Sequence, residues 1–259
     1  PIGKLLVEYS LPAIIAMTVV SLYNVIDSIF IGHGVGAMAI AGLAITFPLM
    51  TLIIAFCTLV GVGAATISSI YMGQKDIQRA TFVLHNAAIL LLVNGLLVTI
   101  VTLIFLDPIL LFFGASHETL PYARDFMQVI LIANPIAYLF VGLNNLMRAT
   151  GYPKKAMLSS FLTVAVNVIV APIFIFVLDW GIRGAAMATA IAQLTGLVWV
   201  LAHFLNKKSF ISFKKGCFKL HRRIIASILS IGMSPFLMNS CACIVVIIIN
   251  TTLQNYGGD

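Results

Sequence analysis

An acidic residue, Asp27, lies inside the first long apolar stretch of the chain, flanked by Leu22–Ile26 and Ser28–Ile31. An ionised carboxylate that faces lipid is costly, so an acid inside a membrane span is expected to face a cavity or a partner. Burial disfavours the charged form of a carboxyl group, which enables such an acid to take up and release a proton or to hold a cation. The alternative is an acid at the membrane edge that reaches water, because Asp27 lies near the end of the stretch.

A proline, Pro12, lies in the same apolar stretch. Proline removes a backbone donor and clashes with the preceding turn, so it kinks or hinges a helix. A helix that carries both a hinge and a titratable acid can bend when the acid changes its charge. A static kink, which is common in membrane helices, is an equal alternative.

Further polar residues occur in apolar stretches. Asn24 precedes Asp27 by three residues and shares its helix face. Asn167 lies in a later stretch, and Thr189 and Gln193 share one face of the next. Such side chains usually form hydrogen bonds to other helices, which is the structural alternative for each one. As a group, they are candidates for lining a site.

Motifs for catalysis are absent from the sequence. It contains no phosphate-cradling loop, no nucleophile elbow and no zinc-protease helix. The four cysteines have no metal-ligand spacing. We therefore expect a protein that is not an enzyme and that binds no metal ion and no cofactor.

The composition indicates which elements position these residues. Apolar residues make up 61% of the 259 residues and charged residues 9%, whereas a soluble domain has roughly 25% charged residues. The uncharged stretches reach the ~20 residues that a membrane-spanning helix needs. The sequence predicts an all-α, polytopic transmembrane helix bundle in a lipid bilayer. Its spans are expected at Leu5–Ile31, Ala39–Tyr71, Arg79–Leu106, Leu120–Leu146, Met157–Leu178, Ala185–Leu205 and Arg223–Leu253, joined by short polar connections.

The basic residues are unevenly distributed over those connections. All of the 15 lysines and arginines except Arg124 and Arg183 fall on the side of the N-terminus. Basic loops stay in the cytoplasm, which predicts a cytoplasmic N-terminus in the cell's inner membrane and explains the net charge of +7 without a nucleic-acid partner. The basic connector at 207–222 is expected either to lie on the anionic inner leaflet or to form a solvated loop.

The last span repeats a pattern of the first. Pro12 is followed fifteen residues later by Asp27, and Pro235 is followed fifteen residues later by Asn250. This spacing predicts a second, parallel repeat of a six-helix unit. We expect a six-helix N-terminal lobe at 1–206, a connector at 207–222, and at 223–259 the first helix of a second, pseudo-symmetric lobe whose remainder lies outside this chain. Asn250 would be the second lobe's counterpart of Asp27.

Several segments along nearly the whole chain resemble the MATE family of multidrug and toxic-compound exporters. The Pro–Asp spacing of the first span and the Arg–Gly–Pro–Lys loop after the fourth are the most specific of these features in combination. The segments that carry the resemblance are Ser10–Pro12, Leu22–Gly32, Gly73–Asp76, Met147–Met157 and Gly181–Thr189.

The resemblance implies two six-helix lobes arranged as a V. It implies a monomeric exporter of amphipathic, often cationic compounds that is driven by antiport of protons or sodium ions. It assigns cation or proton coupling to Asp27, Asn167 and Thr189. Asn24 and Gln193 are possible supporting polar residues on the basis of their positions in the spans alone. Protonation of Asp27 would let the first helix repack at its hinge, Pro12, and release the drug outward.

One position departs from the family pattern. The family often has an aspartate four residues after the asparagine, and here that position is Ala171. A sodium ion would lose a charged oxygen ligand of the kind that hard cations prefer. The resemblance therefore favours proton coupling over sodium coupling.

Two alternatives remain open. A flippase for lipid-linked oligosaccharides or lipid II would share the fold but would need basic residues in its cavity to hold a pyrophosphate, and no basic residue is expected well inside a span. A seven-helix receptor would match the number of spans, but such receptors have an extracellular N-terminus, which the charge distribution opposes.

Overall fold

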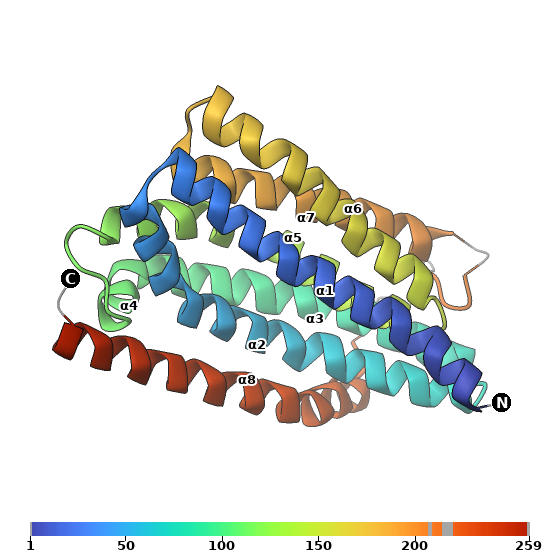
Figure 1. Ribbon diagram of the computed structural model, residues 1–259. Helices are drawn as coiled ribbons and strands as arrows, with labels where there is room; N and C mark the ends of the chain where they lie inside the picture. The colour runs from blue at the N-terminus through green and yellow to red at the C-terminus, as the bar shows by residue number, and fades with distance from the viewer. Residues whose placement is uncertain (1, 207–208, 214–219, 258–259) are drawn as a thin grey trace.

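The computed structural model describes residues 2–206, 209–213 and 220–257. At residues 2–9, 13, 20, 24, 37, 250, 251 and 253–257 it describes the backbone alone. This part of the chain is helical and contains no strand (Figure 1). Its elements are α1 (Ile2–Gly34), α2 (Ala37–Gly73), α3 (Ile77–Ile104), α4 (Leu106–Phe112), α5 (Leu120–Ala149), α6 (Pro153–Pro172), the π-helical η1 (Ile173–Val177), α7 (Gly181–Leu205) and α8 (Arg222–Gly257).

Within the described residues, 7 helices are long and apolar enough to cross a membrane. They coincide with the seven predicted spans, and each boundary differs by a few residues at most. The all-α transmembrane fold class is therefore confirmed. Because the number of spans is odd, α1 begins and α8 ends at opposite ends of the bundle (Figure 1).

The predicted polar connection at 107–119 is wrong in its first half, where the structure has the short helix α4. Leu106 and Leu110 lie one turn apart on this helix, and both are buried. The helix packs against α5. Burial of this apolar face explains why the segment forms a helix although Pro108 and Asp107 suggest a loop.

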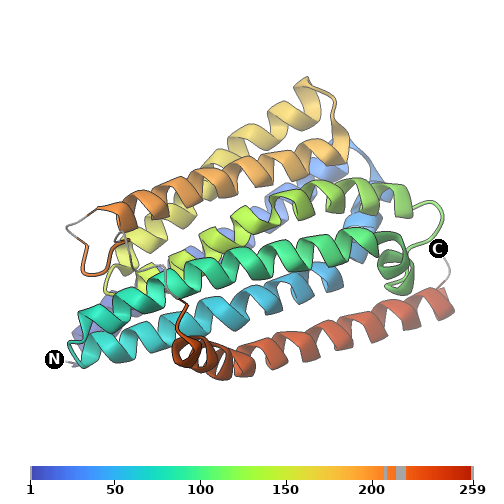
Figure 2. The ribbon, with the colours of Figure 1, turned by 180° about the vertical axis from the view of Figure 1, so that it is seen from behind.

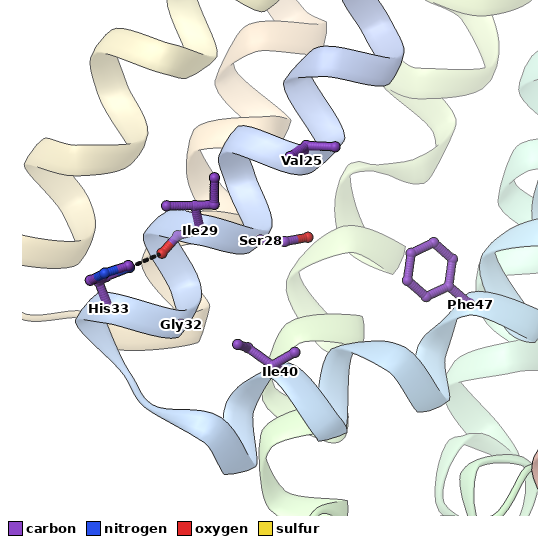
Figure 3. A pocket seen from close by; sticks show the side chains of 7 residues that line it. All are labelled: Val25, Ser28, Ile29, Gly32, His33, Ile40 and Phe47. Atoms are coloured by element: carbon purple, nitrogen blue, oxygen red, sulfur yellow. Dashed lines mark hydrogen bonds between the residues drawn. The ribbon is translucent and has the colours of Figure 1, made fainter.

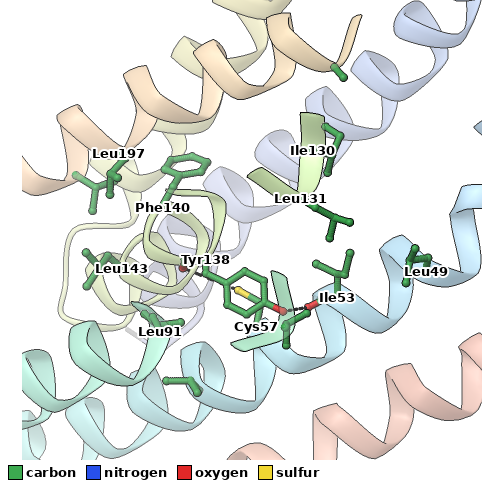
Figure 4. Close-up of a cluster of buried hydrophobic side chains, with 14 of the residues drawn as sticks. Leu49, Ile53, Cys57, Leu91, Ile130, Leu131, Tyr138, Phe140, Leu143 and Leu197 are labelled. Carbon is green, nitrogen blue, oxygen red and sulfur yellow. Dashed lines mark hydrogen bonds between the residues drawn. The ribbon is translucent and has the colours of Figure 1, made fainter. Parts of the chain in front are cut away.

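The centre of the bundle is built from α2, α3 and α5, and its buried side chains interdigitate with Leu197 of α7 (Figure 4). The hydroxyl of Tyr138 on α5 donates to the carbonyl oxygen of Ile53 on α2 at 2.7 Å. This bond satisfies the polar end of a large side chain that is 1% exposed. It therefore fixes α5 against α2 beside the cavity described below.

The two flanks of the bundle differ. On one flank α6 packs against α7, and α1 lies along α6. On the other flank α8 lies along α2 in both views (Figures 1 and 2). The α2–α8 contact brings backbones together, because a Cβ atom at Gly63 would collide with the carbonyl oxygen of Ile228, and one at Gly232 with that of Leu59. Small residues allow such close approach between membrane helices.

The described part of the connector, residues 209–213, packs in part against the ends of α3 and α7. Ile211 is 1% exposed, and the backbone N–H of Phe213 donates to the carbonyl oxygen of Phe204 on α7 at 2.9 Å. The ring of Phe213 also meets His85 of α3 edge-on, with the ring centroids 5.2 Å apart. Ile211 and Phe213 therefore pack against the helix ends, whereas Phe210 is 59% exposed. The two expectations for the connector as a whole stay predictions.

Candidate functional site

A cavity of about 440 Å³ lies between α1, α2, α5, α6 and α7. Apolar residues of α2 and α5, such as Ile53 and Phe140, form much of its wall. Polar side chains gather in two places. One group, Tyr23, Asn167, Thr189 and Gln193, comes from α1, α6 and α7, and the other, Asn144, Asn145, Arg148 and Ser160, lies where α5 meets the first half of α6.

The first polar group contains a hydrogen-bonded triad. The amide of Asn167 donates to the hydroxyl of Thr189 at 3.1 Å and to that of Tyr23 at 3.4 Å. The hydroxyls of Tyr23 and Thr189 lie 3.0 Å apart. Three helices, α1, α6 and α7, therefore meet through polar side chains inside the apolar bundle.

Sequence reasoning selected Asn167 and Thr189, which the structure brings together, but it missed Tyr23. A signal was present, because Tyr23 precedes Asp27 by four residues and so lies on the same face of α1. What sequence reasoning lacked was the partner of that tyrosine on α6 and α7.

The side chain of Asp27 is 9% exposed, which favours the interior alternative over an acid that reaches water. Its Oδ1 atom is buried and has no hydrogen-bond partner among the described residues. A buried carboxylate oxygen without a partner is costly in its charged form. The position therefore suits a carboxyl group that takes up a proton or meets a cation. Asp27 lies one turn beyond Tyr23 and does not itself line the cavity.

The other predicted residues have different placements. Gln193 lines the cavity, whereas the side chains of Asn24 and Asn250 lie outside the described residues. Pro12 is buried, and α1 continues through it, as α8 continues through Pro235. The continuous helix is compatible with a hinge and with a static kink, so the hinge stays a prediction.

The position of the expected family acid is filled by Ala171, which is 0% exposed. It lies one turn after Asn167 on α6 and supplies no oxygen ligand. Among the described residues, no group of three or more His, Cys, Asp or Glu side chains could hold a metal ion. Position 171 thus adds no carboxylate to the site.

Arg148 is a second residue that sequence reasoning missed. The sequence places it in a loop that begins at residue 148, but α5 extends to Ala149 and the arginine lines the cavity. Its side chain is half-buried, and its Nη2 atom donates to Oδ1 of Asn144 at 3.5 Å. Arg148 lies in the last turn of α5, so it reaches the cavity from the end of a span and not from well inside one.

A separate open groove of about 670 Å³ lies between the end of α1 and the first half of α2 (Figure 3). It is lined by Val25, Ser28, Ile29, Gly32, His33, Ile40 and Phe47. The Nδ1 atom of His33 lies 3.0 Å from the carbonyl oxygen of Ile29. This groove uses the face of α1 that turns away from Tyr23 and Asp27, so the cavity is the better candidate for a functional site.

Comparison with known proteins decides the family, because the MatE family model matches residues 12–173. The chain belongs to the MatE family. It is 30% identical to the multidrug export protein MepA of Staphylococcus aureus over 257 residues, which cover 99% of this chain and 57% of that protein. The chain thus spans little more than half the length of this relative.

Solved structures of MatE-type transporters share the fold. The MATE multidrug transporter DinF-BH in complex with rhodamine 6G matches 100% of this chain and 58% of its own, with a TM-score of 0.95 and 33% identity. The inward-facing conformation of a multidrug resistance MATE family transporter matches 95% of this chain and 58% of its own, with a TM-score of 0.86 and 27% identity. The resemblance inferred from the sequence is confirmed.

Proposed function

We propose that the full-length protein exports amphipathic, mainly cationic compounds by antiport with protons, with sodium as the alternative coupling ion. The observation that carries the proposal is a cavity with a polar triad one helical turn from Asp27, whose buried Oδ1 atom has no hydrogen-bond partner among the described residues. Membership in the MatE family supports it, as do the multidrug relative and the neighbour that binds rhodamine 6G.

The proposed cycle rests on competition between the proton and the substrate. A cationic substrate in the cavity favours the ionised form of Asp27, and protonation removes that attraction, so each ligand weakens the binding of the other. Tyr23 connects the acid-bearing helix to α6 and α7 through Asn167 and Thr189. A change in the charge of Asp27 can therefore be transmitted as a shift of α1, with Pro12 as its hinge.

We propose that the protein lies in the inner membrane of the cell, with its N-terminus in the cytoplasm. We also propose that it acts as a monomer. Basic residues on the opposite side are Arg124 and Arg183, and both are paired with acids. Arg124 lies 3.4 Å from Asp107, and Arg183 lies 2.7 Å from Asp125. The positive-inside rule counts lysines and arginines, and all 15 of them except these two fall on the N-terminal side.

The test is transport of the dye rhodamine 6G in inverted membrane vesicles that contain the full-length protein. Wild type is expected to move the dye under an imposed proton gradient, and Asp27→Asn is expected to abolish that coupling. Asp179→Asn is the matched control, because Asp179 is exposed and its positive φ of 54° is tolerated by asparagine. Proton-coupled export by Asp27→Asn would refute the assignment, and export under a sodium gradient would change the coupling ion.

The flippase alternative retains one supporting observation, which is the guanidinium of Arg148 in the cavity. A pyrophosphate needs several cationic donors, and Arg148 is the one basic residue that lines the cavity within the described part of the chain. Export of small amphipathic compounds is therefore the better-supported function. The receptor alternative is excluded by family membership.

A further inference from the structure

We propose that Arg148 binds the carboxylate of zwitterionic amphipathic substrates, so that the cavity recognises a cation near one end and an anion at the other. This inference rests on the proposed export function and specifies part of its substrate range. It concerns the end of the cavity where α5 meets the first half of α6, far from the triad of Tyr23, Asn167 and Thr189.

The guanidinium of Arg148 is incompletely satisfied. It carries five N–H donors, and among the described residues it has one hydrogen bond, the long 3.5 Å contact with Asn144. It forms no ion pair with any acid in that part of the chain, whereas Arg79, Arg124 and Arg183 all do. A half-buried cation without a counter-ion that faces a cavity is suited to an anionic ligand.

Asn144, which accepts the long bond from the guanidinium, is itself fixed by bonds to α6. Its amide nitrogen donates to the carbonyl oxygen of Ala156 at 3.1 Å and to the hydroxyl of Ser159, both on α6. Those bonds orient the side chain and leave its Oδ1 atom to accept from Arg148. Asn144 is 5% exposed, so the guanidinium's one hydrogen-bond partner among the described residues is a buried, cross-linked amide.

The two ends of the cavity are separated by a distance that one small molecule can span. The guanidinium lies at the level of Asn144 and therefore of Ser159 on α6. Asn167 follows on the same helix, about 12 Å further along its axis at 1.5 Å per residue. Between them the wall is largely apolar, with Val164 and Phe140. This arrangement suits an amphipathic molecule with opposite charges on an aromatic body.

The neighbouring lysine does not duplicate the role of Arg148. Lys155 Nζ lies over the ring of Tyr152, 5.0 Å from its centroid, and is outside the cavity lining. Arginine also has a geometric advantage over lysine, because its planar donors match the two oxygens of a carboxylate. Replacement by lysine is therefore expected to restore only part of the binding.

The test uses a matched pair of probes: an unesterified rhodamine dye, which carries a carboxylate beside its cationic ring system, and the methyl ester of that dye. Binding of each is measured by fluorescence polarisation on the purified full-length protein in detergent without anionic lipid. In Arg148→Gln the ratio of carboxylate-dye affinity to ester-dye affinity is expected to fall about tenfold, which corresponds to the low end of the range for one charge-assisted hydrogen bond. Arg148→Lys should lie between wild type and Arg148→Gln.

The control is Arg223→Gln, which removes one positive charge from an exposed position in the first turn of α8 and should leave the ratio unchanged. An unchanged ratio in Arg148→Gln, or an equal loss for both dyes, would overturn the inference. If wild type binds the ester but not the carboxylate dye, the inference fails while the export proposal stands. If wild type binds neither dye, the proposed function fails and this inference fails with it.

Discussion

Removal of the Tyr23 hydroxyl is expected to weaken the attachment of α1 to α6 and α7. Tyr23→Phe deletes the 3.0 Å contact with Thr189 and the 3.4 Å bond from Asn167 and leaves the ring in place. The Asn167–Thr189 bond remains, so neither partner loses all of its hydrogen bonds. A neutral hydrogen bond contributes about 1 kcal/mol to stability, and we expect a loss of about this size.

A double-mutant cycle with Thr189→Val isolates the contact itself. Interhelical hydrogen bonds in membrane proteins have a mean coupling free energy of about 0.6 kcal/mol, and the Tyr23–Thr189 pair should have a value near this mean. The measurement is the free energy of unfolding of the full-length protein in mixed SDS–detergent micelles. Tyr122→Phe is the control, because its hydroxyl has no hydrogen bond among the described residues, and it should change stability little.

The outcome that would refute the reasoning is strict additivity of Tyr23→Phe and Thr189→Val. In that case the two hydroxyls do not form a bonded pair in the membrane protein, and α1 would lack a hydrogen bond to α7 through Thr189. A coupling free energy near the expected value, together with slower proton-driven dye export in Tyr23→Phe, would support transmission through the triad.

Three further predictions concern packing, the proline and the core. Gly232→Ala should destabilise the protein by about 1–3 kcal/mol by overpacking, because the added Cβ atom would collide with the carbonyl oxygen of Leu59. The measurement is thermal unfolding, and the control is Gly73→Ala, where an added Cβ atom meets nothing within 4 Å. Pro12→Ala should slow dye efflux without lowering stability, and an unchanged efflux rate would mean that the proline is a static kink. Tyr138→Phe should cost about 1 kcal/mol in unfolding experiments because it loses a buried hydrogen bond, and an unchanged free energy of unfolding would show that this bond contributes nothing.

The features of this protein that depend on local sequence were predictable, and those that depend on contacts between distant residues were not. The seven spans were predictable because the length of an uncharged apolar stretch is a local property of the sequence. That length can be compared directly with the thickness of the bilayer. Asp27 was predictable for the same reason, since an acid inside such a stretch is conspicuous in the sequence. The short helix α4 was not, because it depends on burial of Leu106 and Leu110 by α5.

The composition of the site depended on tertiary structure. Tyr23 forms hydrogen bonds with Asn167 and Thr189, which follow it in the sequence by 144 and 166 positions. Nothing in the local sequence indicates which helix faces α1. Arg148 lines the cavity from the last turn of α5, where its guanidinium lies beside Asn144, which is bonded to Ser159 of α6. The sequence alone determined that helices of these lengths cross a membrane and which face of α1 carries the acid. Which side chains meet was decided by the packing of the helices, since helix periodicity orients a face but does not select its partner.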